Sequence, residues 1–427
     1  MNERRAGGRS LFLVILVFIV FFVISLLTNI VGPLVPDIIR SFRLNLTLVA
    51  LLPFAFFIAY GVMSIPSGLL LERVREKPVM LGAFGLGLAG ALLFCLFPRY
   101  PTAVISVFLI GLGMAALQVT INPLLRTAGG EEHFAFNSVL AQFVFGGASF
   151  LSPHLYTYFV RNFSLHPGER PLPVRLAALV VPPELPWLSV YWVFAALVLI
   201  MILALAATRF PVVIKKEEER AGAWAAHREL FGRRIVVLYF LGIFAYVGTE
   251  QGVANWISQF LATYHGYDPQ TTGAAAVSGF WGMMTVGCLL GLVLLKLFDS
   301  RRVLVGFAAA ALVVLGVALF GPGPLARWAF PLLGFTASVM WSIIFSLALN
   351  SVDRHHGSFS GILCTGIIGG ALVPLAIGWL GDRFGLRFGL CLLFLTLAYV
   401  LSIGLWARPL IVNATISARR TEGRREA

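Results

Sequence analysis

The chain has 427 residues, of which 59% are hydrophobic and only 12% are charged, and its mean hydropathy is +0.90. This composition is typical of an integral membrane protein and excludes a soluble globule. The formal net charge of +13 would suit nucleic acid. Nearly all Lys and Arg residues lie between the apolar segments, however, so we expect the lipid bilayer and no nucleic acid as partner.

Twelve apolar segments follow one another along the chain. Most are long enough to cross a hydrocarbon core of about 30 Å as a helix of about 20 residues. Backbone groups in lipid must be paired within the segment, so each span is predicted to be a helix. The expected spans are residues 11–36, 46–71, 78–98, 102–125, 134–160, 187–208, 235–263, 271–295, 303–320, 328–351, 358–381 and 388–407.

The loops differ in their basic content. The N-terminal tail with Arg4, Arg5 and Arg9, the even-numbered loops and the C-terminal tail carry most of the 32 Lys and Arg residues. By the positive-inside rule both termini are predicted to be cytoplasmic, in a multi-pass protein of the cell membrane. The first apolar run is far longer than a signal-peptide core, so we interpret it as a span.

An internal repeat appears at a constant offset of 223 residues. It aligns Phe84 with Phe307, Pro101 with Pro324, Gly111 with Gly334, and residues 146–148 with 369–371. The repeat predicts two parallel six-helix halves, residues 1–208 and 235–427, joined by a charged cytoplasmic connector at 209–234. Parallel repeats of this kind are typical of the major facilitator fold, in which solute binds near the midplane and access alternates.

Several motifs resemble one branch of the major facilitator superfamily, the fucose permeases and glucose/galactose transporters. They are Gly111-Leu-Gly-Met-Ala-Ala-Leu-Gln118-Val-Thr-Ile-Asn122-Pro123, Ala141-Gln142, Tyr246-Val-Gly-Thr-Glu250-Gln-Gly, Ile344-Phe-Ser-Leu347 and Gly366-Ile-Ile-Gly-Gly-Ala-Leu-Val-Pro374. The resemblance implies a secondary active or facilitative transporter of a small polar solute, most often a monosaccharide. It implies no enzyme activity and no cofactor, and we expect a monomer.

The chain departs from this branch at three positions. The fucose/proton symporter of the family carries protons on carboxylates in spans 1 and 4, where this chain has Gly32 and Gln118. Phe145 replaces an Asn in span 5. Proton coupling by the usual route is therefore not expected, and a coupling cation is a candidate partner only if another group titrates.

Amide and indole side chains are the predicted solute contacts in spans 1, 4, 5 and 10. Gln118 and Asn122 share a face of span 4. The repeat places Trp341 of span 10 at the position equivalent to Gln118. Sugar hydroxyls need donors and acceptors, and the apolar face of a pyranose stacks on an aromatic ring. Asn29 and Gln142 are further candidates. The alternative for the amides is hydrogen bonding between helices.

Span 7 carries the densest polar set. Gln251 and Asn255, with Ser258 and Gln259, share one face, whereas Glu250 would point toward a neighbouring helix unless Gly248 and Gly252 break the span. A carboxylate in a membrane span marks a functional site by default, so Glu250 is the predicted binding and coupling residue; a structural, hydrogen-bonded Glu is the alternative. Trp256 and Trp281 are either stacking platforms or packing residues.

Gly68-x-Leu70-x-Glu72-Arg73 after span 2 resembles the gating motif of the superfamily, in which an acid caps a helix N-terminus. Glu72 and Arg73 are the predicted gating residues, with a solvated charge run as the alternative. Residues 378–385, Gly-Trp-Leu-Gly-Asp-Arg-Phe-Gly, repeat the pattern on the opposite side, which we interpret as a coincidence of shape or a loop-shortening turn. His154 near the end of span 5 is a structural histidine or a second coupling candidate.

No phosphate-binding loop, hydrolytic triad or metal-ligand spacing is found in the sequence, so neither an ATP-driven pump nor catalysis is expected. Besides the sugar carrier, two functions stay open. An exporter of amphipathic drugs or lipids is favoured by Phe145 and by the 36 Phe residues. A membrane receptor that does not transport would need only the fold.

Overall fold

The computed structural model describes residues 11–129, 134–208, 229–230, 232–352 and 356–409, and every regular element in these ranges is a helix. In chain order they are α1 (Leu11–Thr28), α2 (Val31–Phe42), α3 (Leu46–Val74), α4 (Glu76–Leu96), α5 (Tyr100–Gly129), α6 (Phe134–Phe163), α7 (Leu172–Ala177), η2 (Pro186–Leu188), α8 (Ser189–Ala207), α10 (Arg234–His265), η4 (Pro269–Gly273), α11 (Ala274–Leu297), α12 (Ser300–Phe320), α13 (Gly323–Ala337), α14 (Met340–Leu349), α15 (His356–Thr365), η5 (Gly366–Ile368), α16 (Gly369–Phe384), α17 (Leu386–Leu390) and α18 (Leu392–Trp406).

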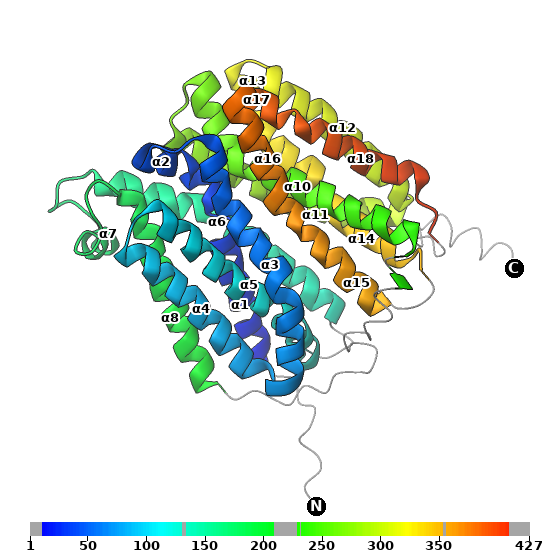
Figure 1. The fold of residues 1–427 in the computed structure, drawn as a ribbon, viewed down its shortest axis with the longest axis horizontal. Coiled ribbons are helices and arrows are strands. Elements are labelled where there is room, and N and C mark those ends of the chain that lie inside the picture. Colours follow the sequence, from blue (N-terminus) through cyan, green and yellow to red (C-terminus); the bar gives the residue numbers. More distant parts are fainter. Residues whose placement is uncertain (1–10, 130–133, 209–228, 231, 353–355, 410–427) are drawn as a thin grey trace, which may run out of the picture. The chain divides into compact units, whose positions relative to one another are not determined.

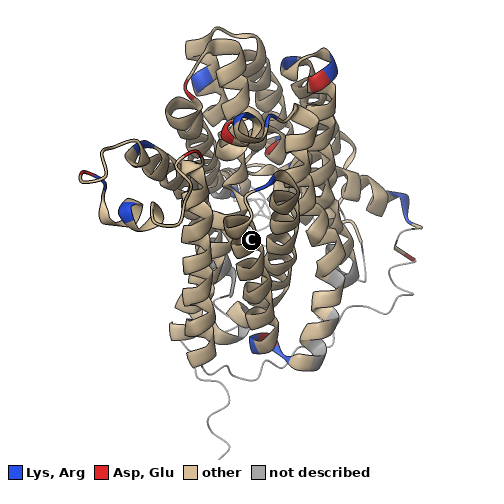
Figure 2. Ribbon diagram, turned by 60° about the vertical axis from the view of Figure 1, so that its left-hand side comes forward, with Lys and Arg blue, Asp and Glu red and all other residues tan. Residues whose placement is uncertain are grey.

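Within the described residues, eleven helical segments are long and apolar enough to cross a membrane. The remaining predicted span, 134–160, corresponds to α6, which is a helix from Phe134 to Phe163. Figure 2 shows that the charged residues gather largely at helix ends and in the connections, as membrane burial requires.

Contacts divide the chain into two compact units, Met1–Leu44 with Leu51–Glu217, and Asn45–Ala50 with Glu218–Ala427. In the first unit α4 packs against α5 and α8, and α1 packs against α5 and α6 (Figure 1). Its core contains an aromatic cluster in which the Phe94 ring lies 5.9 Å from Trp187 and 4.9 Å from Tyr191. The predicted connector at 209–234 lies mostly outside the described residues.

In the second unit, α10 is the central helix and packs against α16 and α18, while α12 and α11 pack against α13. Glycines allow the closest contacts. A Cβ at Gly334 or Gly369 would collide with the backbone carbonyl of Phe280 or Phe244, respectively. Small residues at such positions let two helix backbones approach closely in a membrane protein.

The first predicted span is wrong in its continuity, because it forms two helices, α1 and α2, that are separated by a turn at Asn29 and Ile30. Pro33 explains the break. Proline has no N–H to donate to the Asn29 carbonyl, and its ring clashes with that carbonyl in a regular helix. The second helix then continues to Phe42, past the predicted end at residue 36.

Spans 10 and 11 are also interrupted. Ser338 and Val339 form a turn between α13 and α14, and the short helix η5 separates α15 from α16. At the first break Ser338 and Val339 pack directly onto Gly287 and Gly291 of α11, where a Cβ would collide with their side chains. No proline lies at either turn. We therefore attribute these breaks to tertiary contacts.

Asp37 corrects the expectation that Glu250 is the single charged residue inside a span. It lies in α2, within the apolar segment Leu11–Phe42, and is only 4% exposed. The Tyr156 hydroxyl of α6 donates to its Oδ2 at 2.6 Å, and Arg40 lies 3.9 Å from its Oδ1. The first span was predicted to end at residue 36, one residue before Asp37.

The two related motifs after α3 and α16 share one backbone feature. Arg75 has φ 68° and ψ 179°, and Gly385 has φ 89° and ψ 148°, so each turn is made by one residue in a region that favours glycine. The second motif is therefore a loop-shortening turn. It also has a capping role that we did not predict: Asp382 accepts hydrogen bonds from the backbone N–H of Leu46 at 2.7 Å and of Thr47 at 2.8 Å.

Candidate functional site

Glu250 of α10 lies at the centre of a polar cluster in the second unit. Its carboxylate accepts a hydrogen bond from Gln251 Nε2 at 3.2 Å and a second from the Tyr246 hydroxyl, one turn earlier. The Tyr246 ring lies 6.2 Å from the ring of Trp341 in α14. A half-buried carboxylate thus has an amide and a phenol as donors and two aromatic rings beside it.

Span 7 is not broken at its glycines, because α10 runs without interruption from Arg234 to His265. Gly248 and Gly252 serve close packing instead. A Cβ at Gly248 would collide with Val373, and one at Gly252 would lie 2.9 Å from Leu393. The neighbouring Thr249 contacts α18, where its Oγ1 lies 2.6 Å from Thr396 Oγ1.

The polar face predicted for span 7 is largely satisfied within the protein. The Asn255 amide donates to the Gln251 carbonyl at 2.8 Å, the Ser258 hydroxyl to the Pro269 carbonyl at 3.4 Å, and the Gln259 amide to Thr263 Oγ1 at 3.0 Å. Gln251, Asn255 and Ser258 are buried. Of this face, Gln251 alone reaches Glu250 among the described residues.

The break between α13 and α14 begins at Ser338, three residues before Trp341 of the Glu250 cluster. The Ser338 carbonyl that the break frees accepts a hydrogen bond from Cys288 Sγ of α11 at 3.3 Å, and Cys288 also interacts electrostatically with Glu250. The buried Ser338 hydroxyl has no hydrogen-bond partner among the described residues. Broken helices commonly build the solute sites of transporters, because they leave polar groups free inside the membrane.

Two predicted tryptophans differ in their hydrogen bonding. The Trp256 indole N–H donates to the Pro374 carbonyl of α16 at 3.4 Å, and the side chain is 1% exposed. Trp281 of α11 is 5% exposed, and its indole N–H has no acceptor among the described residues. Unsatisfied buried donors are uncommon in folded proteins, and a water molecule or a ligand can satisfy them.

In the first unit, Asn29 lies at the break between α1 and α2. Its amide donates to Ser149 Oγ of α6 at 2.9 Å, and the Ser25 hydroxyl donates to the Phe145 carbonyl at 2.6 Å. Ser152 Oγ donates to the Leu26 carbonyl at 3.2 Å. These bonds join α1 to α6, whereas the Gln142 side chain on the same helix is exposed.

For the other predicted residues the structure gives the helix and, for two of them, the burial of the side chain. Gln118 is half-buried in α5, and His154 is exposed on α6 with its ring 5.1 Å from that of Phe150. Asn122 lies in α5, and Glu72 and Arg73 lie in α3, but their side chains are outside the described part of the structure. The binding role of Asn122 and the gating roles of Glu72 and Arg73 stay predictions.

Comparison with known proteins decides the family. The sequence model of the Major Facilitator Superfamily matches residues 17–374, which is most of the chain. The chain belongs to this superfamily. It is 29% identical over 392 residues to the glucose/galactose transporter of Brucella abortus biovar 1 (strain 9-941), covering 91% of this chain and 92% of that protein. It is 25% identical over 390 residues to the L-fucose-proton symporter of Escherichia coli (strain K12), covering 86% of each.

Solved structures show the same fold. A crystal structure of a variant of the Escherichia coli fucose:proton symporter matches with a TM-score of 0.65 at 21% identity, over 94% of this chain and 100% of that one. An inward-facing structure of a bacterial homologue of the human lysosomal transporter Spinster matches with a TM-score of 0.76 at 14% identity, over 93% of this chain and 96% of that one. This superfamily member is therefore a membrane transporter and not an enzyme.

Sequence reasoning missed three residues of interest. Asp37 follows directly on the predicted end of span 1, and a longer first span would have included it. Tyr246 stands one helical turn before Glu250, which is the spacing at which side chains on a helix meet. Ser338 carried no signal, since neither proline nor glycine marks the break at which it lies.

Proposed function

We propose that this protein carries a monosaccharide across the cell membrane by alternating access. The proposal rests on the cluster on α10, α11 and α14. In this cluster Tyr246 contacts both the Glu250 carboxylate and the Trp341 ring. Two relatives that are named as glucose/galactose and L-fucose transporters support the same class of solute.

Polar and aromatic groups of the second unit suit a sugar. A carboxylate accepts several hydrogen bonds from hydroxyl groups, whereas the indole N–H of Trp281 and the hydroxyl of Ser338 can donate to sugar oxygens. The half-buried Trp341 ring, stacked on Phe345 at 5.7 Å, offers an aromatic surface for the apolar face of a pyranose. Gln118, Asn122 and Gln142 are the contacts that we propose from the first unit.

A binding experiment tests the solute class. Glucose, galactose and fucose should raise the unfolding temperature of the purified full chain, because a ligand that binds only the folded state stabilises it. The Trp341→Ala variant should weaken sugar binding by about 1–3 kcal/mol, by loss of stacking and burial. Trp328→Ala is the matched control, since Trp328 is 69% exposed on α13.

Two results would refute the sugar proposal. One is stabilisation by tetraphenylphosphonium but by none of the sugars, which would favour the exporter of amphipathic compounds. The other is equal sugar affinity in Trp341→Ala and the parent, which would remove the α14 aromatic from the site. Stabilisation by sugars without uptake into proteoliposomes would instead indicate a receptor.

We also propose the orientation predicted from the charge distribution, with both termini in the cytoplasm. It is supported by the excess of Lys and Arg in the tails and the even-numbered loops. A membrane-impermeant thiol reagent applied to intact cells should then fail to label a cysteine introduced at Ser10 or Ser417. Labelling of either site from outside would reverse the topology.

A further inference from the structure

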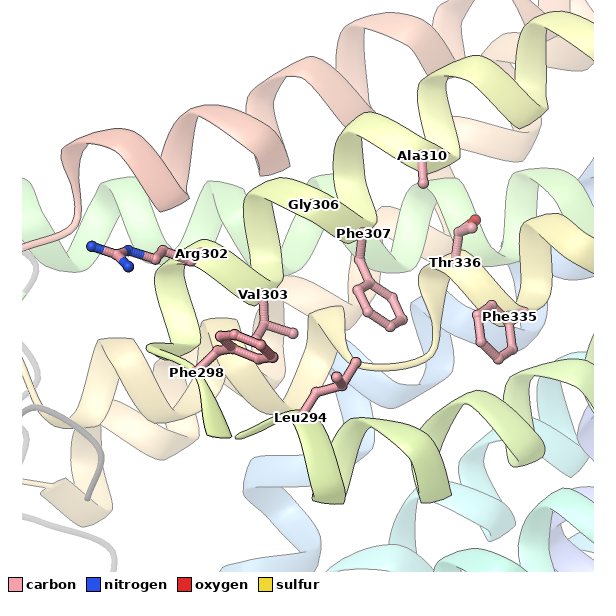
Figure 3. A pocket seen from close by; sticks show the side chains of 9 residues that line it. All are labelled: Leu294, Phe298, Arg302, Val303, Gly306, Phe307, Ala310, Phe335 and Thr336. Atoms are coloured by element: carbon pink, nitrogen blue, oxygen red, sulfur yellow. The ribbon is translucent and has the colours of Figure 1, made fainter. Parts of the chain in front are cut away.

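A cavity of about 370 Å³ lies between α11, α12 and α13 of the second unit. Its walls are mainly apolar, and the rings of Phe298, Phe307 and Phe335 and the backbone of Gly306 line it (Figure 3). Its volume lies at the lower end of the range of about 300–1,000 Å³ that is usual for small-molecule sites. The hydroxyl of Thr336, which also lines it, donates to the Leu333 carbonyl of its own helix at 2.9 Å. The cavity therefore offers a hydrocarbon chain a good environment and a sugar almost no hydrogen bonds.

The three helices that line this cavity, which we call the groove, also expose apolar side chains. Val293 of α11, Val313 of α12 and Leu332 of α13 are all exposed. In a chain of membrane-spanning helices, exposed apolar side chains along the spans face lipid tails rather than water. The groove is thus accessible to the acyl chains of the bilayer.

The one charged residue that lines the groove is Arg302. In Figure 3 its side chain extends from the first turn of α12 away from the aromatic rings. The apolar segments of α11 and α12 meet at residues 297–300, so Arg302 lies where the spans end and phosphate groups of lipids are found. Its guanidinium is exposed.

Arg302 differs from the neighbouring basic residue in its partners. The Arg301 guanidinium is held by Asp299 at 3.4 Å and by the Ala407 carbonyl at 3.1 Å. Among the described residues no carboxylate forms an ion pair with Arg302, and the exposed Lys296 adds a second positive charge at this connection. The positive charge of Arg302 at the end of the groove is therefore complementary to an anionic headgroup.

We propose that this groove binds an anionic phospholipid, with one acyl chain between α11, α12 and α13 and the phosphate at Arg302. Basic pockets between membrane helices are a known chemical setting for anionic headgroups. The site is separate from the Glu250 cluster and does not depend on which solute is transported. Its ligand would stabilise the packing of α12 against α13, which forms the groove.

Native mass spectrometry of the purified full chain with phosphatidylglycerol and phosphatidylcholine tests the headgroup. The parent should retain phosphatidylglycerol preferentially, and Arg302→Gln should lose about fivefold in affinity for it, equivalent to about 1 kcal/mol per basic residue. Phosphatidylcholine binding should not change. Arg327→Gln is the control, because Arg327 is also exposed but lies on α13 outside the groove. Equal retention of the two lipids by the parent, or equal loss in both variants, would overturn the proposal.

A second pair of variants tests the acyl chain. A Cβ at Gly306 or at Gly316 of α12 meets no atom within 4 Å, so both positions have open space beside the backbone. Gly306→Phe should fill the groove and reduce binding of both lipids at least fivefold, whereas Gly316→Phe should leave it as in the parent. If Gly306→Phe still retains phosphatidylglycerol, or if inorganic phosphate competes with the lipid equally in parent and Gly306→Phe, the site recognises an anion only and the acyl-chain assignment is wrong. Displacement of the lipid by glucose would assign the groove to the solute pathway instead.

Discussion

The indole N–H of Trp281 is the most informative unsatisfied group in the second unit. Leaving such a donor buried without a partner costs about 1–3 kcal/mol. A protein retains such a group when a ligand or water satisfies it during function. Trp256 of the same unit is also buried, but its indole N–H donates to the Pro374 carbonyl, as expected of a structural tryptophan.

We expect Trp281→Phe to weaken sugar binding by about 0.5–1.5 kcal/mol, the net contribution of one hydrogen bond, without lowering the unfolding temperature. Trp256→Phe should do the opposite, since it removes a bond between α10 and α16 and leaves the solute contacts intact. Equilibrium binding and thermal unfolding of both variants separate these effects. A loss of stability with unchanged affinity in Trp281→Phe would assign this residue to packing.

At the scale of the element, single residues decide how helices begin and end. Arg75 makes the turn between α3 and α4 in a conformation that is otherwise almost restricted to glycine, and Gly385 makes the equivalent turn after α16. Residues 378–385, which repeat the pattern, end in Gly where the first motif has Arg75. The positive φ at both positions is the physical reason for a glycine there.

Arg75→Gly should therefore raise the free energy of unfolding by about 1–2 kcal/mol, by removing the steric cost of a side chain at positive φ. Gly385→Arg is the matched reverse change, and it should lower stability by a similar amount because φ there is 89°. Thermal unfolding in detergent measures both. The explanation by backbone strain fails if the two substitutions shift the midpoint in the same direction.

Asp382 acts on an element distant in sequence, since its carboxylate accepts the N–H groups of Leu46 and Thr47 at the beginning of α3. Gly378 permits this approach, because a Cβ there would lie 2.6 Å from the Leu46 carbonyl oxygen. A carboxylate at a helix N-terminus satisfies free donors and complements the helix dipole. The contact thus links the end of α16 to the start of α3.

Removing this cap in Asp382→Ala should cost about 0.5–2 kcal/mol, as loss of an N-cap usually does. Hydrogen exchange should become faster at residues 46–50 and remain unchanged in α10. Asp268→Ala is the control, because Asp268 caps η4 by bonding the Gln270 N–H and the Thr271 hydroxyl. Unaltered exchange at the start of α3 in Asp382→Ala would show that the cap contributes nothing.

For the molecule as a whole, energy coupling is the main open property. The resemblance aligns Gly32 and Gln118 with the titrating carboxylates of the fucose/proton symporter, so we do not expect proton coupling by that route. Glu250 is half-buried and Asp37 is buried, and each lies in a described span with polar partners. Glu250 lies with the proposed solute contacts, whereas Asp37 is held by Tyr156.

In proteoliposomes, sugar uptake down its gradient should persist without a pH difference, and an inward proton gradient should produce no accumulation above equilibrium. If accumulation does occur, Glu250→Gln should abolish it and preserve sugar exchange, while His154→Gln should change neither because His154 is exposed. Proton-driven accumulation that survives Glu250→Gln would assign coupling to another group. Asp37→Asn is then the next variant to measure.

The amino-acid sequence by itself determined the helical membrane fold and most of its spans. Long apolar runs leave no alternative to helices, because lipid offers no hydrogen bonds to an unpaired backbone. The same reasoning singled out Glu250, since a carboxylate in such a run is costly whatever its neighbours are.

Tertiary structure alone decided which polar groups are satisfied and where helices break. Gly248 and Gly252 could have broken span 7, but contacts with Val373 and Leu393 show that they serve close packing in a continuous helix. Ser338 lies at a break that no local signal marks, and Asp382 caps a helix more than 300 residues away in the chain. These features depend on which side chains meet across helices, and the periodicity of one segment carries no information about the surface of another.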